Sequence, residues 1–425
     1  MKPILIHTHF HKRRTGITRS VENVLPFFNE KFETYIYGYN VKGNKISFAK
    51  LKSLLRSERK IIVHCHRNNE IIRMLFYRFL GAKFTLFATR HAETVPSGVT
   101  KFLLKKVDKV ITLIESMSEH LGISNTIVSH GVDVHLFSPK EEVKLPHITQ
   151  ENIILCAGRV RKAKGHLTLM EAAKILKDHK KWALVIVGKV DKPLFLQELK
   201  AIGEKNGIKN QLYFIDETSE IISYYQASKI TVVPSFSEGF SLVTAEAMSC
   251  GSSVIATKNV GVHSSLISHA KNGYLFESGN VSELENLLLQ SIKKEIPLLG
   301  KQAREEIIVN WSAKKEATHL MDLYQSIKMR GNMETSFAKD LERGQKIEKE
   351  VLVWVKKKYD DAYLVEGYCK EWDIHIPCDD KGVEVKYQVL QWGPCIVHLK
   401  ISEDFQQKLL KGAAEAKKNK KDYRP

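Results

Sequence analysis

The sequence predicts an α/β fold in which two Rossmann-like, doubly wound parallel sheets face a cleft, followed by a small α+β module. Short apolar runs rich in β-branched residues alternate with segments of helical periodicity through residues 1–330, which is the pattern of parallel βαβ units. A polar stretch, KEEVKLPHITQE at 140–151, divides this alternation in two. We therefore expect a first domain at 1–139, a second at 140–332 and the small module at 333–425.

The first domain opens with a strand and a glycine-containing turn. A helix is predicted from about Thr18 to Phe28, because Val21, Val24 and Leu25 recur at helical spacing. Gly16, in the turn before this helix, could bring backbone N–H groups close to a phosphate or a sugar. A plain βα turn explains the same residues. The strands expected in this domain are 2–7, 34–37, 60–64, 84–89 and 107–113.

Histidines follow two of these strands, at the edge where an open α/β sheet binds its ligands. His64, Cys65 and His66 fit a metal site poorly, because neighbours on a strand point to opposite faces and no second cluster accompanies them. His91, after the strand at 84–89, could hydrogen-bond a sugar in the cleft. A surface histidine with ordinary partners is the alternative for His91.

The second domain opens with a strand at 152–157 that runs into the basic turn GRVRKAKG at 158–165. Arg159 and Lys164 supply cations suited to a diphosphate, and the glycines permit close approach of the backbone to an anion. A basic, solvated turn is the alternative interpretation. Further strands are expected at 183–187, 211–214, 230–233 and 253–257, with a closing helix at 303–329.

The segment 234–257, PSFSEGFSLVTAEAMSCGSSVIAT, carries the strongest chemical pattern in the chain. A polar turn precedes a short helix that Ser241 is expected to cap and Gly251 to end. The backbone N–H groups from Gly239 to Leu242 lie at the start of this helix, where free donors and the helix dipole favour an anion. We therefore expect a phosphate there.

Two carboxylates accompany that expected anion site. Glu238 lies in the turn before the helix, and Glu246 lies eight residues later, in the second turn of the helix. Such carboxylates suit neutral hydroxyl partners such as ribose and hexose. Two solvated glutamates on an ordinary helix are the alternative.

The formal net charge of +18 is concentrated in the first third of the chain. Residues 1–140 hold 23 Lys and Arg against 10 Asp and Glu, whereas residues 141–425 hold 43 against 38. This excess predicts an anionic partner for the first domain, and a membrane surface or phosphorylated acceptor fits an enzyme better than nucleic acid does.

Composition places the chain among globular proteins. It has 43% hydrophobic and 27% charged residues, and no apolar run approaches the roughly 20 residues of a membrane span. Its six cysteines lack metal-ligand spacing, which predicts reduced thiols in a cytoplasmic protein.

Taken in order, these motifs resemble those of retaining GT-B glycosyltransferases, which use nucleotide-diphosphate sugars. The resemblance covers about residues 1–330 and is most specific in the Glu-Gly-Phe-Ser…Glu-Ala-Met string at 238–248. Four segments resemble more narrowly the lipopolysaccharide core mannosyltransferases of alphaproteobacteria: Thr15-Gly16-Ile17-Thr18, Thr89-Arg90-His91-Ala92, Ser129-His130-Gly131-Val132-Asp133 and Gly158-Arg159-Val160-Arg161.

The chain departs from the family pattern at two places. His130 stands where the family usually has Asn, and Phe214-Ile215-Asp216 stands where it usually has Phe-x-Gly. The second departure leaves the nucleotide base open.

The resemblance implies a role for each matched residue, and it makes His91 and Glu238 the catalytic residues. Enzymes of this family need no bound metal or cofactor for transfer, because cations and a helix dipole stabilise the departing diphosphate. By this resemblance, Arg159 and Lys164 would bind the diphosphate, and Glu246 would bind the ribose. Glu238 would bind the sugar together with the amides of Gly239, Phe240 and Ser241. His91 and Gly16 would approach the transferred sugar from the first domain.

Residues 333–425 resemble the core of PD-(D/E)xK nucleases. Glu348 lies on an expected helix, Asp373 follows Trp372, and Glu384 and Lys386 share one face of an expected strand. The resemblance implies that the carboxylates would hold Mg while the lysine orients water or phosphate. The near-neutral charge and the short stretch after the motif depart from that pattern. An active nuclease, a degenerate module and a fusion of neighbouring reading frames remain alternatives.

We therefore expect a retaining hexosyltransferase that moves mannose from GDP-mannose to a lipopolysaccharide core or another glycolipid acceptor. It would lie peripherally on the cytoplasmic face of the inner membrane, against anionic lipid. One alternative is a nucleic-acid enzyme, in which a Mg-dependent nuclease acts while the first 330 residues recognise or glycosylate DNA. Another is a GT-B scaffold that binds without catalysis. Acceptor, sugar, nucleotide and oligomeric state are left open by the sequence.

Overall fold

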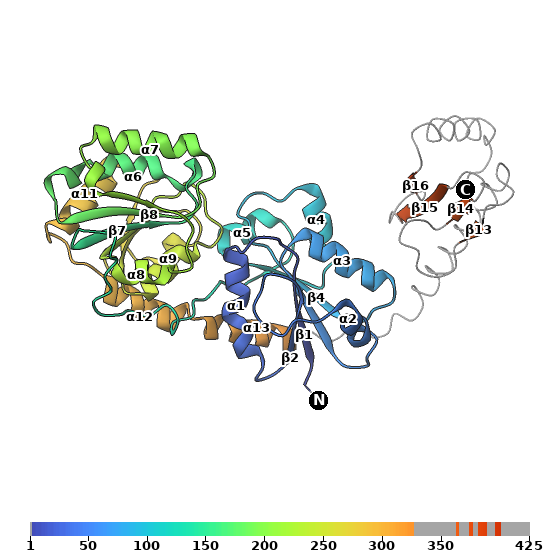
Figure 1. The fold of residues 1–425 in the computed structure, drawn as a ribbon. Helices are drawn as coiled ribbons and strands as arrows, with labels where there is room; N and C mark the ends of the chain where they lie inside the picture. Colours follow the sequence, from blue (N-terminus) through green and yellow to red (C-terminus); the bar gives the residue numbers. More distant parts are fainter. Residues whose placement is uncertain (1, 327–362, 365–373, 377–380, 389–395, 401–425) are drawn as a thin grey trace. The chain divides into compact units, whose positions relative to one another are not determined.

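The structure, a computed structural model, describes residues 2–326 and four short strands at 363–364, 374–376, 381–388 and 396–400. The chain divides into two compact units, Met1–Met329 and Arg330–Pro425. The first unit contains two six-stranded parallel sheets, each with helices on both faces (Figure 1). The predicted pair of doubly wound sheets is therefore confirmed.

The first sheet has the strand order β2-β1-β3-β4-β5-β6. Every residue of β1, β3 and β4 is buried, as expected of parallel strands covered on both faces. Helices α2, α3 and α4 pack on one face, whereas α1 and α13 pack on the other. The strands are β1 (Ile4–His9), β2 (Glu33–Gly38), β3 (Ile61–Cys65), β4 (Thr85–Thr89), β5 (Lys109–Thr112) and β6 (Thr126–Ile127). The helices are α1 (Gly16–Phe28), α2 (Phe48–Leu55), α3 (Asn68–Phe79), α4 (Gly98–Leu104) and α5 (Glu115–Leu121).

The second sheet has the order β12-β11-β10-β7-β8-β9. Helices α6, α7 and α11 cover one face, and α8, α9 and α12 cover the other. The strands are β7 (Asn152–Ala157), β8 (Trp182–Val187), β9 (Leu212–Ile215), β10 (Ile230–Val233), β11 (Ser253–Thr257) and β12 (Tyr274–Phe276). The helices are α6 (His166–Ala172), α7 (Pro193–Lys205), α8 (Ile221–Ala227), α9 (Leu242–Ser249), α10 (His263–Leu266), α11 (Val281–Ile292), α12 (Gly300–Asn310) and α13 (Ala313–Ser326).

The chain passes between the two sheets twice, and the two passages lie side by side. We call the first sheet with α1–α5 and α13 the first lobe, and the second sheet with α6–α12 the second lobe. Val132 N–H donates to the carbonyl oxygen of Trp311 (2.8 Å), and Ala313 N–H donates to that of Val132 (2.8 Å). A Cβ atom at Gly131 would lie 2.4 Å from the Ser312 carbonyl oxygen, so this approach requires glycine.

The last helix of the first unit packs on the first lobe. The sequence predicted one helix over 303–329, but the structure has α12 and α13 separated at Trp311-Ser312. The prediction was wrong because both segments have helical periodicity, while the break is imposed by the backbone bonds to Val132. Beyond the break, Leu320 and Tyr324 of α13 enter the core beside α1.

Most strands that the sequence predicts are present, with ends that differ by one or two residues from the predicted ones. The strands that were not predicted are short. The two- and three-residue strands β6 and β12 were not predicted, because so few residues give no periodicity. Helix α9 was predicted, but not its cap geometry. Ser241 has a left-handed backbone (φ 75°) and its hydroxyl pairs with the Thr244 hydroxyl (2.9 Å) rather than with a backbone N–H.

The described part of the second unit is a four-stranded antiparallel sheet. Its order is β13-β14-β15-β16, with β13 (Tyr363–Leu364), β14 (Ile374–Ile376), β15 (Lys381–Gln388) and β16 (Ile396–Lys400). Glu384 and Lys386 lie on β15, as expected, in register with Lys400 and His398. Glu348 and Asp373 lie outside the described residues, so the nuclease-like site stays a prediction.

Candidate functional site

The residues predicted to bind a diphosphate and a sugar lie together after β7 and β10. Lys164 Nζ lies 2.5 Å from Glu238 Oε1, and the Ser235 hydroxyl donates to the same oxygen (2.7 Å). The Glu238 side chain is 10% exposed. A carboxylate with so little exposure is stabilised by cationic and hydroxyl partners of this kind. The structure thus brings Lys164 and Glu238 into one ion pair.

The turn 158–165 lies directly on the turn that carries Glu238. Gly165 has φ +69°, and a Cβ atom there would lie 1.8 Å from the Pro234 carbonyl oxygen, so only glycine permits the contact. Around Gly158, by contrast, no atom lies within 4 Å of the position of a Cβ. Arg159 stands at the rim, half-exposed, with Nη1 3.6 Å from Asp191 Oδ1.

The first lobe meets the second at the N-terminus of α9. A Cβ atom at Gly239 would lie 2.5 Å from the backbone carbonyl oxygen of His91. Phe240 is buried, with its ring edge-to-face with His130 at 5.4 Å and close to Trp311. The Phe240 side chain therefore packs between the lobes, and only its backbone faces the start of α9.

The N-terminus of α1 faces the same place. Gly16 is the first residue of α1, and a Cβ atom there would lie 3.7 Å from Leu242 Cδ1 of α9. Thr15 N–H donates to the Thr18 hydroxyl (3.0 Å), and Arg67 Nη2 donates to the Thr15 hydroxyl (3.2 Å). Two helix N-termini and a further cation, Arg67, thus surround the site that the sequence assigned to an anion.

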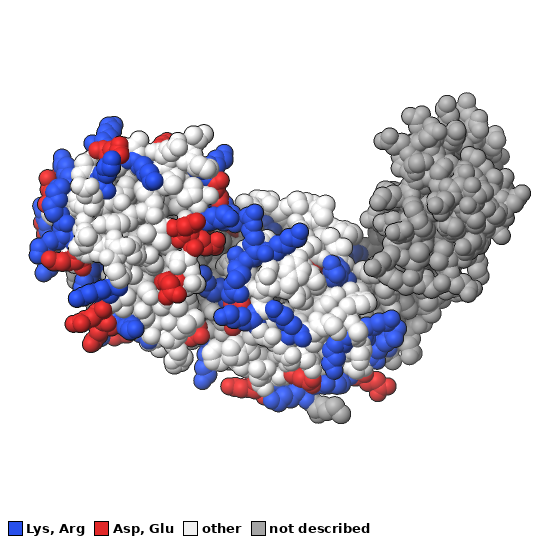
Figure 2. All heavy atoms as spheres, in the orientation of Figure 1, with Lys and Arg blue, Asp and Glu red and all other residues white. Residues whose placement is uncertain are grey.

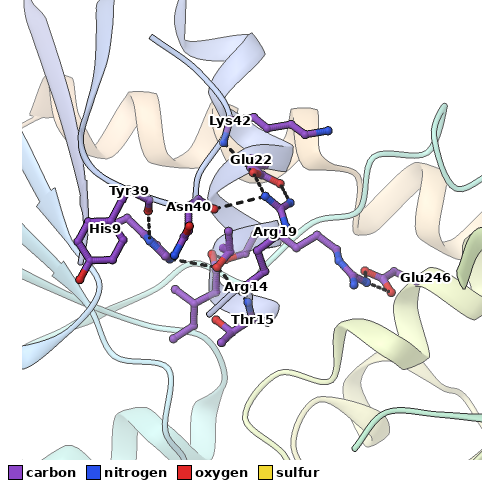
Figure 3. A network of polar contacts seen from close by, with 12 residues as sticks. His9, Arg14, Thr15, Arg19, Glu22, Tyr39, Asn40, Lys42 and Glu246 are labelled. Atoms are coloured by element: carbon purple, nitrogen blue, oxygen red, sulfur yellow. Dashed lines mark hydrogen bonds and ion pairs between the residues drawn. The ribbon is translucent and has the colours of Figure 1, made fainter. Parts of the chain in front are cut away.

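Glu246 has a partner that the sequence did not reveal. Its carboxylate is fully buried, and Arg19 Nη1 lies 2.6 Å from each of its oxygens (Figure 3). The Tyr225 hydroxyl donates to Oε2 (3.2 Å). Burial raises the pKa of Glu246, while Arg19 and Tyr225 oppose that rise. The carboxylate that was predicted to bind ribose therefore holds an arginine of the first lobe.

Four histidines form a hydrogen-bonded row along the C-terminal edge of the first sheet. We call them the histidine chain. Their nitrogens are joined in the order His7 Nδ1 to His66 Nε2 (3.1 Å), His66 Nδ1 to His91 Nε2 (3.1 Å), and His91 Nδ1 to His130 Nε2 (3.2 Å). His130 Nδ1 ends the row on Glu316 Oε1 of α13 (2.8 Å). Burial lowers the pKa of His7 to about 3 and also lowers the pKa of His66 and His91 well below the ordinary value.

Glu316, at one end of the histidine chain, sets the direction in which its hydrogen bonds are donated. Glu316 also accepts the Gly131 N–H at Oε2 (2.7 Å), and a carboxylate only accepts. His130 therefore donates from Nδ1. When all four rings are neutral, its Nε2 is an acceptor, and the histidines behind it each donate from Nδ1 to the ring ahead. Both ring nitrogens of His91 are used in this way, so the group of residue 91 that reaches the second lobe is its backbone carbonyl.

His7 also approaches His64 and His66, which the sequence argument against a metal site did not foresee. One nitrogen from each lies within 4.8 Å of the others. His64 bonds the Tyr324 hydroxyl (2.6 Å) and the Thr89 hydroxyl (2.7 Å), and both nitrogens of His66 serve the histidine chain. Only His7 Nε2 lacks a partner among these atoms. The three residues are thus arranged for hydrogen bonding.

The missed residues had weak or no signals in the sequence. Arg19 directly follows the quoted Thr-Gly-Ile-Thr string, but nothing nearby marks its partner. His130 was noted only as a departure from the family pattern. Glu316 lies on a helix whose boundary was mispredicted, 186 residues from His130.

Comparisons with known proteins agree with this architecture. Residues 137–310 match the family model for glycosyl transferases group 1. The lipopolysaccharide core biosynthesis mannosyltransferase LpcC of Rhizobium leguminosarum bv. viciae is 26% identical over 339 residues, which are 76% of this chain and 96% of the relative. The lipopolysaccharide core biosynthesis mannosyltransferase LpsB of Rhizobium meliloti is 29% identical over 278 residues, which are 62% of this chain and 79% of LpsB. The crystal structure of Anabaena Alr3699/HepE in complex with UDP has a TM-score of 0.66 at 16% identity, covering 77% of this chain and all of that one. The predicted GT-B fold is confirmed.

Proposed function

We propose that this glycosyltransferase moves mannose from GDP-mannose to a lipopolysaccharide core or related glycolipid, with retention of anomeric configuration. The observation that carries the proposal is the convergence of Lys164, Glu238 and Glu246 with the N-termini of α1 and α9. The two rhizobial relatives are described as lipopolysaccharide core biosynthesis mannosyltransferases, which supports mannose as the sugar and a lipopolysaccharide core as the acceptor. The HepE structures contain UDP or UDP-glucose, which supports a nucleotide-sugar donor.

The geometry suits the departure of a nucleoside diphosphate. The start of α9 and the cations of Lys164 and Arg159 would hold the diphosphate, and Glu238 would accept hydrogen bonds from sugar hydroxyls. The bond from the anomeric carbon to the diphosphate oxygen breaks, and an acceptor hydroxyl oxygen bonds that carbon from the same face. Its proton passes to the departing phosphate oxygen. The His91 carbonyl oxygen, beside Gly239, would face the positive charge that develops on the sugar.

An apolar and basic surface on the first lobe supports a lipid-linked acceptor. The α3–α4 face exposes large apolar side chains, with Phe76 54% and Phe102 53% exposed. Residues 67–106 hold eight Lys and Arg against two Asp and Glu, and Lys106 Nζ lies 5.6 Å from the Phe102 ring centroid. Lys and Arg side chains spread over the visible face of this lobe (Figure 2). Apolar and basic groups together favour an anionic membrane surface. The exposed apolar residues of this face are Ile72, Phe76, Phe79, Leu80, Val99 and Phe102.

No helix in the part of the chain that the structure describes is both long and apolar enough to span a bilayer. We place the enzyme at the cytoplasmic face of an inner membrane, held there by the α3–α4 face.

Donor binding tests the proposal directly. Thermal unfolding is followed with GDP-mannose, UDP-glucose and an ADP-sugar, for wild type, Glu246→Gln and the control Glu277→Gln, whose carboxylate pairs with Lys258 on the surface. At 100 times Kd a donor stabilises the folded state by about 2.7 kcal/mol. We expect GDP-mannose to raise Tm in wild type and in the control but not in Glu246→Gln. A rise in Tm with UDP-glucose or the ADP-sugar alone would contradict GDP-mannose as the donor. No rise in Tm with any of the three would contradict the proposed donor site.

A further inference from the structure

Arg19 occupies the position that the donor ribose needs. The family resemblance assigns the ribose hydroxyls of the donor to the carboxylate of Glu246. In the structure both oxygens of that carboxylate bind Arg19 Nη1, each at 2.6 Å. Arg19 accounts for two of the hydrogen bonds that this carboxylate accepts and Tyr225 for a third. Ribose hydroxyls would therefore compete with the guanidinium for the two oxygens.

The surroundings of Glu246 explain why the empty site holds a cation. The carboxylate is 0% exposed, on a helix whose residues are nearly all buried. An isolated buried carboxylate is strongly disfavoured. Arg19 supplies the compensating charge, and Glu246 in turn raises the pKa of the Arg19 guanidinium. The ion pair thus offsets part of the cost of burying the Glu246 carboxylate.

Arg19 is also placed to bind the anion that arrives with the ribose. It lies on α1 one turn after Gly16, whose backbone faces the N-terminus of α9. Its side chain is 39% exposed, and within residues 2–326 its hydrogen bonds involve Nη1 alone. Nε and Nη2 can therefore donate to phosphate oxygens, for which a guanidinium fork is well suited.

We propose that Arg19 is a displaceable occupant of the ribose site, which moves from Glu246 to the diphosphate when the donor binds. This inference rests on the proposed function, because it presumes a nucleotide-diphosphate ligand. It gives Arg19 two opposite effects on binding. The arginine competes with the ribose, whereas it attracts the diphosphate.

A ligand series separates these two effects. Affinities for guanosine, GDP and GDP-mannose are measured by calorimetry, with uridine, UDP and UDP-glucose in parallel, for wild type and Arg19→Gln. We expect Arg19→Gln to bind the nucleoside about threefold or more tightly, because the competitor is gone. It should bind the diphosphates at least about tenfold more weakly, because the phosphate contact is lost. An arginine that only bridges the lobes would change both affinities in the same direction.

Arg14 provides a matched control on the same segment. It pairs with Glu22 of α1 at 2.5 Å and donates to the Asn40 carbonyl oxygen, and both partners lie in the first lobe (Figure 3). Arg14→Gln should leave every affinity within about twofold. Arg19→Lys, which keeps a cation on a shorter side chain and so holds Glu246 less closely, should tighten nucleoside binding while keeping diphosphate affinity within about threefold. It also carries the test if Arg19→Gln fails to fold.

The outcomes distinguish this inference from the proposed function. If wild type binds no nucleoside diphosphate, the proposed function fails and the inference with it. If wild type binds a diphosphate but nucleoside and diphosphate affinities change in parallel in Arg19→Gln and Arg19→Lys, only the inference fails. Opposite changes support it.

Discussion

Two cations from different lobes pair with Glu238 and Glu246, which lie eight residues apart in the chain. Lys164, in the same lobe, holds Glu238, whereas Arg19, in the other lobe, holds Glu246. A salt bridge within one lobe survives any movement between lobes, but the second pair exists only while the lobes meet. The two carboxylates therefore differ in what their ion pairs depend on: the pair of Glu238 depends on the second lobe alone, and the pair of Glu246 depends on contact between the lobes.

Replacing Glu238 by Gln should lower kcat/KM by about 10- to 100-fold. A hydrogen bond to a charged group contributes about 1.5–3 kcal/mol, and the change leaves Lys164 without its buried carboxylate. Steady-state transfer from the donor to a glycolipid acceptor measures the effect. Glu277→Gln, in an exposed pair, should stay within about twofold. Equal activity of the two variants would show that Glu238 makes no contact in the transition state.

Residues with short-range signatures could be predicted, and residues with distant partners could not. Glu238, Glu246 and Lys164 each stand in a recognisable string. Arg19 and Glu246 are 227 residues apart, and no local pattern links them. Pairs of this kind depend on how two lobes meet, which a single sequence does not state.

At the scale of elements, the C-terminal edge of the first sheet concentrates imidazoles. β1 contributes His7, the turn after β3 His66, the turn after β4 His91 and the turn after β6 His130. Neighbouring parallel strands place the residues at their ends close together, which lets the rings bond one after another. The strands of this sheet, except the short β6, could be predicted from their apolar runs, whereas their order is a finding of the structure. The row itself could not, because it needs the register between strands.

Acid should destabilise the first lobe because of this row. An unfolded histidine has a pKa of about 6.5, whereas the pKa of folded His7 is about 3 and those of His64, His66 and His91 are also lowered by burial. Below pH 6.5 the unfolded chain thus binds more protons, so the free energy of unfolding falls as pH falls. The slope is about 1.4 kcal/mol per pH unit for each histidine that stays neutral when folded.

Urea unfolding between pH 7.5 and 5 measures that slope. His120→Gln, which removes an exposed histidine, should show the same slope as wild type. Stability that is flat or rises on acidification would contradict the assignment of neutral, buried imidazoles.

The α3–α4 face should decide membrane binding. Phe76→Ser and Phe102→Ser should each weaken binding to vesicles containing anionic phospholipid by about tenfold, since burying a Phe side chain is worth about 1.5–3 kcal/mol. Added salt should weaken wild-type binding further. Leu194→Ser, at a 78% exposed position on α7, serves as the control in co-sedimentation. An equal loss in the control would show that the α3–α4 face has no special part.

At the scale of the whole first unit, the paired passage between the lobes leaves no room for a side chain at Gly131. Gly131→Ala would place a Cβ 2.4 Å from the Ser312 carbonyl oxygen and 2.6 Å from Ala313 N. Overpacking of this kind costs about 1–3 kcal/mol, so Tm should fall by several degrees. Gly98→Ala, where nothing lies within 4 Å, should leave Tm nearly unchanged. Differential scanning calorimetry compares them, and matching Tm values would mean that the passages can separate at little cost.

The return of α13 to the first lobe limits how the enzyme can be divided. A fragment ending at residue 310 would retain the whole family-matched segment, yet it would strip Leu320, Met321 and Tyr324 from the core beside Val21 and Phe28. It would also leave His130 without Glu316. The first lobe is therefore not a contiguous stretch of sequence. An isolated version for acceptor or membrane studies would need residues 2–130 joined by a designed linker to 313–326.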